Sequence, residues 1–80
     1  MKLPRDLGGR ELAKLLSRYG YRVSRQTGSH LRLTTSLGGE HHVTIPAHDA
    51  LRVGTVSAIL QEVATHLKRN RAELIDELWG

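Results

Sequence analysis

Residues 21–46, YRVSRQTGSHLRLTTSLGGEHHVTIP, decide the fold of this chain. Apolar and polar residues alternate in three short runs of this stretch, which is typical of half-buried β-strands. The second and third runs place four apolar side chains on one side, namely Leu31, Leu33, Val43 and Ile45. Glycine-containing segments, TGS and LGGE, separate the three runs. Because these connections are short, the stretch predicts a three-stranded antiparallel meander.

Helical periodicity surrounds these strands. Residues 8–20 carry apolar side chains at helical spacing, with Gly8 as the expected N-cap and Gly20 as the stop. Residues 54–69 show a second apolar stripe, for which Thr55 is the expected N-cap. A short third helix over residues 70–79 is expected to begin at Asn70.

The order of these elements predicts an α+β fold of the type α-β-β-β-α with a short C-terminal helix. Helices are expected to cover one face of the sheet and to leave the other face polar and open. At 80 residues we expect one domain over 1–80, with a core at about 8–66 and a helical extension at about 70–79.

The expected strand register gives His30 a defined position. Pairing Val23 with Leu33 keeps apolar residues on one side, and it places Gln26 opposite His30. The loop between these strands is then Thr27–Ser29, with a glycine that can adopt a positive φ. Pairing Leu33 with Val43 brings His30 close to Pro46, so His48 is expected to follow nearby.

The charge balance favours an anionic partner. The chain has 12 Lys and Arg, a formal net charge of +4 and a sequence pI near 10.1, so nucleic acid is the first candidate. Aromatic residues make up only 4% of the chain, which favours binding through phosphates and shape over base stacking.

The absence of cysteine excludes disulfides and thiolate metal sites. No apolar run is long enough for a membrane span, and MKLPRDLGGR lacks the apolar core of a signal peptide, so a cytoplasmic protein is expected.

The histidines allow several interpretations. His30 is either a surface residue without a role or the proton-transfer group of a site, and His48 is either a loop residue or a second such group. Metal binding is disfavoured, because the adjacent His41 and His42 point to opposite faces of a strand and no structural-zinc spacing is present. Ser29 next to His30 does not form a nucleophile–base pair, since neighbouring strand residues diverge and no acid is placed to orient the imidazole.

Two longer stretches, GRELAKLLSRYGYRVSRQTGSHLRL and VTIPAHDALRVGTVSAILQEV, resemble the HicA toxin family of toxin–antitoxin systems. The resemblance covers about residues 8–66 and rests on Gly20, Arg25–Gln26, Gly28–His30, Ile45–His48 and Gly54–Thr55 in this order. It implies a fold like the double-stranded-RNA-binding domain and an endoribonuclease that cleaves mRNA. It also implies a HicB-type antitoxin that covers the active site, and it makes His30 the catalytic histidine.

The expected chemistry needs neither a metal nor a cofactor. RNA carries its own nucleophile, the 2′-hydroxyl, and an imidazole titrates close to neutral pH. His48 is the candidate for the second proton carrier. The expected RNA-binding residues are Arg10, Lys14, Arg25, Gln26, Gly28, Ser29 and Arg32. The alternatives are a non-catalytic RNA-binding module and an adaptor that binds a protein partner through the same face; the free protein is expected to be a monomer or a weak oligomer.

Overall fold

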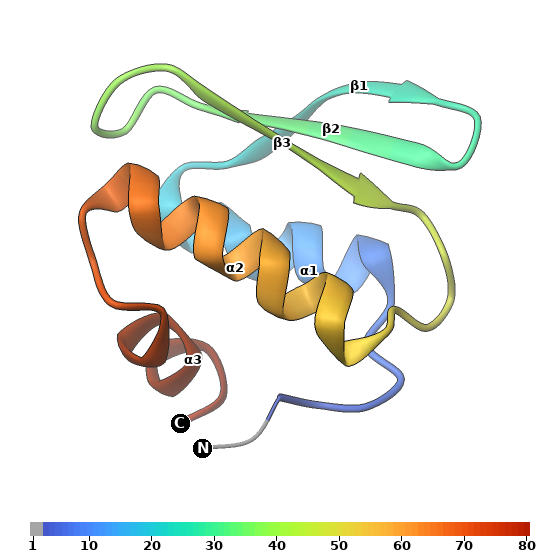
Figure 1. Cartoon of the computed structure of the whole chain (residues 1–80). Coiled ribbons are helices and arrows are strands. Elements are labelled where there is room, and N and C mark those ends of the chain that lie inside the picture. The colour runs from blue at the N-terminus through green and yellow to red at the C-terminus, as the bar shows by residue number, and fades with distance from the viewer. Residues whose placement is uncertain (1–2) are drawn as a thin grey trace.

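The computed structural model describes residues 3–80. Its elements are, in order, α1 (Gly9–Leu16), a 3₁₀ turn η1 (Ser17–Tyr19), β1 (Arg22–Thr27), β2 (His30–Thr35), β3 (His41–Pro46), α2 (Val53–Leu67) and α3 (Arg71–Trp79). The strands form one antiparallel sheet in the order β1-β2-β3. Figure 1 shows α1 and α2 side by side beneath this sheet, whereas no element of residues 3–80 covers its upper face. The expected α+β fold, like the double-stranded-RNA-binding domain and with an added C-terminal helix, is confirmed.

One core lies between the sheet and the helices. Leu31 and Leu33 of β2 and Ile45 of β3 are fully buried, as is Leu16 of α1. Ile59 of α2 is 4% exposed and joins the same cluster. The uncovered face carries the alternate residues of each strand, so the alternation in the sequence correctly separates the core side from the open side in β2 and β3.

A β-bulge in β1 changes the predicted register. Val23 pairs with Leu33 as expected, but the next pair is Arg25 with Arg32, which leaves Ser24 as an extra residue in β1. Thr27, not Gln26, is therefore the partner of His30, and the hairpin turn contains two residues, Gly28 and Ser29, instead of three. Because a bulge inserts one residue, it exchanges the faces of all the residues that follow it.

Strand β1 also differs from the prediction in its burial. Val23 is on the helix side of the sheet, but its side chain is 48% exposed, and all six residues of β1 are exposed. β1 is an edge strand, and α1 does not extend far enough to cover it. Tyr21, directly before β1, is the inward residue that the core buries.

Local interactions define both ends of the first helical segment. Gly8 is extended, and its N–H donates to the Glu11 carboxylate at 2.9 Å, so the predicted N-cap is confirmed. The segment ends in η1 and then in Gly20, whose φ of 82° only glycine adopts without strain. A Cβ at Gly9 would overlap the carbonyl oxygen of Pro46, so this glycine allows α1 to begin directly against the end of β3.

The beginning of α2 was predicted incorrectly. The helix begins at Val53, and Arg52 is its extended N-cap residue without a side-chain cap. Thr55 therefore lies inside the first turn. The sequence signal misleads here because a threonine is a good cap only where the backbone leaves the helical region, and that change occurs at Arg52.

The C-terminal helix α3 packs on the helical layer. Asn70 Oδ1 accepts from the Ala72 N–H at 2.7 Å and Glu73 Oε1 accepts from the Asn70 N–H at 3.0 Å, so the predicted capping box is confirmed. Leu74 is fully buried and Ile75 is 9% exposed. Figure 1 shows α3 below the C-terminal end of α2, on the side away from the sheet. Among residues 3–80, no helix has the length and apolar character that a membrane span requires.

Candidate functional site

The open face of the sheet is organised in rows that cross the three strands. Each row contains one residue of each strand, because each outward residue of β2 pairs with one residue of β1 and one residue of β3. From the hairpin end, the rows are Thr27–His30–Pro46, Arg25–Arg32–Thr44 and Arg22–Thr34–His42. The three rows combine an exposed imidazole, an arginine pair and a polar network on one solvent-facing surface.

His30 begins β2 at the edge of this surface. Its ring is solvent-exposed, and the following residue, Leu31, is fully buried, so His30 faces away from the core. Gly28, in the adjacent turn, has a φ of 54°, and no atom lies within 4 Å of a Cβ built on it. The space beside Gly28 is therefore open to a phosphate or ribose that approaches the turn before His30.

The bulge brings two arginines together in the second row. Strict alternation along β1 would point Arg25 toward the helices, but the register pairs it directly with Arg32 on the open face. Like charges placed opposite each other across strands destabilise a sheet. The ion pairs within residues 3–80 involve neither arginine. Two adjacent guanidinium groups without a carboxylate partner, next to His30, form a site suited to an oxyanion.

Three other predicted RNA-binding residues, Arg10, Lys14 and Gln26, lie on the helix side of β1. After the bulge, Gln26 pairs with Leu31 and so faces this side, which corrects its expected place on the open face. Arg10 and Lys14 are exposed on α1 and line a hollow of ≈ 330 Å³ together with Val23. The predicted residues thus do not form one surface, because they lie on both sides of the exposed edge of β1.

His48 is close to the His30 end of the sheet. The Ala47 N–H donates to the Ser29 carbonyl at 2.6 Å, which ties the residue before His48 to the residue before His30. The His48 carbonyl accepts from the Gly9 N–H at 2.9 Å, so the segment is also held at the beginning of α1. The His48 side chain is exposed. The backbone therefore brings both histidines to one corner of the molecule, as the sequence predicted.

A chain of hydrogen bonds that the pattern of the sequence does not predict crosses the third row. Ser24 Oγ lies 2.7 Å from Thr34 Oγ1, which lies 2.7 Å from His42 Nδ1. His42 Nε2 lies 2.9 Å from Glu40 Oε2. Ser24 reaches Thr34 only because it is the bulged residue, so periodicity alone could not have predicted the network. Alternation did place Arg22, Thr34 and His42 on the outer side.

The strongest electrostatic perturbations occur away from His30. Burial raises the pKa of Tyr21 to about 12, and burial together with the neighbouring His66 lowers the pKa of His41. The Tyr21 hydroxyl lies 2.7 Å from His41 Nδ1, and the His41 ring stacks on His66 with centroids 4.3 Å apart. His41 and His66 are half-buried and pack together at the opposite end of the sheet from His30.

A second charged cluster holds α3 in place. Glu77 accepts from Tyr19 Oη at 2.7 Å and forms a bidentate pair with Arg69. The Arg69 guanidinium and then the Tyr19 hydroxyl lower the pKa of Glu77 to about 2. These interactions connect α3 to η1, and they are structural because they lie far from the open face. Within the described part of the chain, no group of three His, Cys, Asp or Glu side chains is arranged to hold a metal ion.

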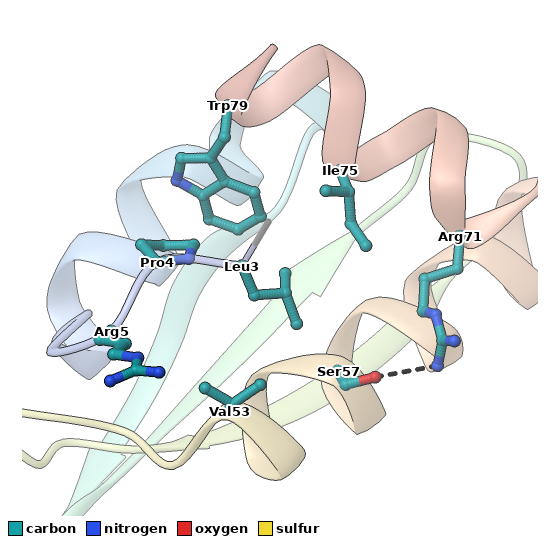
Figure 2. Close-up of a pocket in the computed structure, with 8 residues that line it drawn as sticks. All are labelled: Leu3, Pro4, Arg5, Val53, Ser57, Arg71, Ile75 and Trp79. Carbon is teal, nitrogen blue, oxygen red and sulfur yellow. Dashed lines mark hydrogen bonds between the residues drawn. The ribbon is translucent and has the colours of Figure 1, made fainter. Parts of the chain in front are cut away.

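A larger hollow is remote from the histidines of the open face. Its volume is ≈ 860 Å³, and it lies between the N-terminal segment, the beginning of α2 and α3. Figure 2 shows Leu3, Ile75 and Trp79 directed into it, with Arg71 donating to Ser57 Oγ at its rim. Its lining residues include no carboxylate, and they do not combine a nucleophile with a base. Size alone therefore does not make it the reactive site.

The open face has the groups that phosphodiester cleavage in RNA requires. An exposed imidazole can accept or donate a proton, and the neighbouring guanidinium groups can stabilise negative charge on phosphate oxygens. Attack by the 2′-hydroxyl of RNA needs no activated water, because the nucleophile belongs to the substrate.

Comparison with known proteins identifies the family of the chain. A family model described as the HicA toxin of bacterial toxin–antitoxin systems matches residues 9–64. No curated protein and no solved structure matched the chain significantly. The matched range contains α1, the whole sheet and most of α2, so it includes every residue of the open face described above. The chain therefore belongs to the HicA toxin family, whose members are toxins that act together with an antitoxin partner.

Proposed function

We propose that this toxin is a metal-independent endoribonuclease that cleaves mRNA and that His30 is its proton-transfer residue. The observation that carries the proposal is the position of His30, exposed on the uncovered face and next to the Arg25–Arg32 pair. RNA needs only a base, an acid and positive charge for cleavage, because it supplies its own nucleophile.

The reaction consists of one displacement at phosphorus. His30 removes the proton from a ribose 2′-hydroxyl, and the 2′-oxygen forms a bond to the adjacent phosphorus. The bond from phosphorus to the 5′-oxygen breaks, and that oxygen takes up a proton as it leaves. The products are a 2′,3′-cyclic phosphate and a 5′-hydroxyl. Arg25 and Arg32 stabilise the additional negative charge on the phosphoryl oxygens in the transition state.

His48 is the proposed donor of the second proton. It is exposed, and the Ala47–Ser29 hydrogen bond holds its segment beside the turn that precedes His30. A base and an acid on opposite sides of one phosphate is the arrangement that this displacement needs. Replacing His48 with alanine should therefore reduce cleavage by a factor comparable to that for His30.

RNA is proposed to lie across the open face and to pass over the edge of β1. Arg25 and Arg32 contact phosphates on the open face, while Arg10, Lys14 and Gln26 contact the strand where it continues on the helix side of β1. Gly28 and Ser29 form the turn between the two surfaces, where the lack of a side chain at Gly28 permits close approach. The charge of +4 favours such an extended anionic partner.

The antitoxin partner is proposed to be a HicB-type protein that covers the His30 face. Blocking the open face would exclude RNA from both the imidazole and the arginine pair. An acidic partner would associate rapidly with a protein of this charge. The proposed place of action is the cytoplasm, where mRNA is available to a toxin released from its antitoxin.

Cleavage of a defined RNA by the wild type, His30→Ala and His48→Ala tests the mechanism. His30→Ala should lose about 10²–10⁴ in rate, because that is the usual contribution of a general acid or base. The variant should stay folded and bind RNA, since the exposed ring contributes little to packing. The wild type should act in excess chelator and leave 5′-hydroxyl ends.

Two results would contradict the mechanism. Full activity of His30→Ala would remove His30 from the chemistry. Strict dependence on a divalent ion, with 5′-phosphate products, would mean that a metal-activated water is the nucleophile. Binding of RNA without cleavage by the wild type would instead support a non-catalytic RNA-binding module.

A further inference from the structure

A second polar hollow lies at the opposite end of the open face from His30. Its volume is ≈ 390 Å³, which is within the range of small-ligand pockets. It is lined by Arg22, Glu40, Gly20 and the three hydroxyl residues Thr34, Thr35 and Ser36. The hollow thus contains one cation, one anion and three hydroxyl residues, at the far end of the sheet from the catalytic candidate.

The two opposite charges in this hollow do not neutralise each other. The ion pairs within residues 3–80 do not include Arg22, and the partner of Glu40 is His42 Nε2, at 2.9 Å. Arg22 and Glu40 therefore lie more than 4 Å apart, although they line the same space. A ligand that fits between them must offer hydrogen-bond acceptors to the guanidinium and donors to the carboxylate.

The hydrogen-bonded chain behind the hollow holds the carboxylate in position. His42 Nε2 donates to Glu40 Oε2, and His42 Nδ1 lies 2.7 Å from the Thr34 hydroxyl. Thr34 is held in turn by Ser24, the residue inserted by the bulge. The His42 contact uses one lone pair of Glu40, and a carboxylate has about four acceptor sites, so most of them remain available to a ligand.

We propose that this hollow is a subsite for a guanine base of the RNA substrate, an inference that rests on the proposed function. Guanine presents two acceptors, O6 and N7, which the planar fork of an arginine binds as a bidentate pair. It also presents two adjacent donors, N1–H and N2–H, which a carboxylate accepts. Arg22 and Glu40, which line the same hollow without pairing with each other, provide these two partners.

The other bases satisfy this pair of groups less well. Adenine directs the lone pair of N1 at the carboxylate and lacks O6, so it has one donor where guanine has two. Cytosine has one amino group and no adjacent N–H. Uracil has one N–H between two carbonyl oxygens, which the carboxylate would repel. A good bidentate contact discriminates by about 1–3 kcal/mol, which corresponds to a factor of roughly 5–150 in affinity, and solvent exposure of Glu40 favours the lower part of this range.

The position of the hollow also predicts where the guanine lies in the substrate. Thr34 is four residues beyond His30 on β2, and a strand rises about 3.3 Å per residue, so the two sites are about 13 Å apart. The bound base is then not at the cleaved bond. A guanine preference should therefore appear at a fixed offset from the cleavage position, with His30 acting on a neighbouring nucleotide of any sequence.

Binding of short 2′-O-methylated RNAs tests the subsite without any cleavage. The probes are two labelled hexanucleotides, one of adenine only and one with a single guanine, measured by fluorescence anisotropy. We expect the guanine-containing probe to bind the wild type roughly tenfold more tightly. Glu40→Gln should abolish this preference and can shift it toward adenine, because a glutamine amide pairs with adenine N6 and N7. Arg22→Lys should reduce it, because lysine keeps the charge but loses the fork.

Matched variants separate base recognition from general charge. Glu62→Gln and Arg52→Lys change equivalent exposed groups outside the hollow, and they should leave the guanine preference intact. Equal affinity of the wild type for both probes, or no binding of either, would overturn the subsite, as would a preference that Glu40→Gln does not alter. These results are distinguishable from failure of the ribonuclease proposal, because a guanine preference in a protein that cannot cleave RNA would support the subsite and contradict only the catalytic step.

Discussion

Leu33 and Val23 offer a sharp test of which face of the sheet is buried. The two residues are cross-strand partners on the same side of the sheet. Leu33 is fully buried, whereas Val23 is 48% exposed at the uncovered edge. The same type of truncation, to alanine, should therefore have very different effects at two neighbouring positions.

The expected magnitudes follow from burial. Leu33→Ala removes packed methyl groups and leaves a cavity in the core, which costs about 2–5 kcal/mol. For a domain of 80 residues the whole free energy of unfolding is about 4–12 kcal/mol, so this single change removes a large part of it. A loss of about 3 kcal/mol corresponds to a fall in Tm of roughly 12–24 °C. Val23→Ala should cost about 0.5 kcal/mol or less, as is usual for surface positions.

Thermal unfolding followed by circular dichroism measures both variants against the wild type. Urea unfolding checks the free energies, provided that the m-values stay unchanged. The argument is refuted if Leu33→Ala melts close to the wild type while Val23→Ala is strongly destabilised. That result would mean that the helices cover the other face of the sheet.

Three further predictions concern the Glu77 cluster, RNA binding and the antitoxin. Because Arg69 and Tyr19 hold the pKa of Glu77 at about 2, below its ordinary value of 4.5, the stability from this cluster is present above pH 4.5 and is lost as the pH falls toward 2. Thermal unfolding of Glu77→Gln should lack this loss, and a slope identical to that of the wild type would contradict the assignment. RNA affinity should fall steeply with salt, and Lys14→Ala or Arg32→Ala should flatten the log–log slope by up to ~1 while weakening all sequences about equally. A salt-independent affinity would exclude phosphate contacts as the main interaction. In the complex with the antitoxin, hydrogen exchange should be slowed over residues 26–32, whereas protection confined to α3 would place the antitoxin elsewhere.

Much of the fold could be predicted because one side of β2 and β3 is buried. Leu31 and Leu33, with Ile45 opposite, leave only one register that keeps apolar residues inside, and this register is the observed one. The N-caps at Gly8 and Asn70 could also be predicted from the sequence, because each is followed three residues later by a glutamate.

The wrong predictions about the sheet concern β1, where burial does not determine which side chains face the helices. β1 is exposed on both sides, and an inserted residue at Ser24 has no signature in the sequence. The true position of Arg25 and Gln26 could not be derived for this reason. The network from Ser24 to Glu40 was missed as a consequence, since it depends on the bulge.

The candidate site was predictable in part. The exposure of His30 and its proximity to Pro46 followed from alternation and register. The division of the basic residues between the two sides of β1 did not follow, because it depends on where α1 lies relative to the edge of the sheet. A role for Arg22 could not be predicted, since only the pairing of the strands brings it close to Glu40.

The extra residue in β1 affects which charges the open face of the sheet carries. Deleting Ser24 would make Val23 and Arg25 consecutive, and their partners Leu33 and Arg32 are already consecutive, so both residues would keep their faces. If Ser24 instead paired regularly in the ladder, Arg25 would move to the helix side and Gln26 to the open face. The open face would then exchange a cation for a neutral amide although neither residue had been substituted. The presence or absence of the bulge thus determines on which side of the sheet the charge of Arg25 lies. Comparisons of substituted positions alone would not detect such a change.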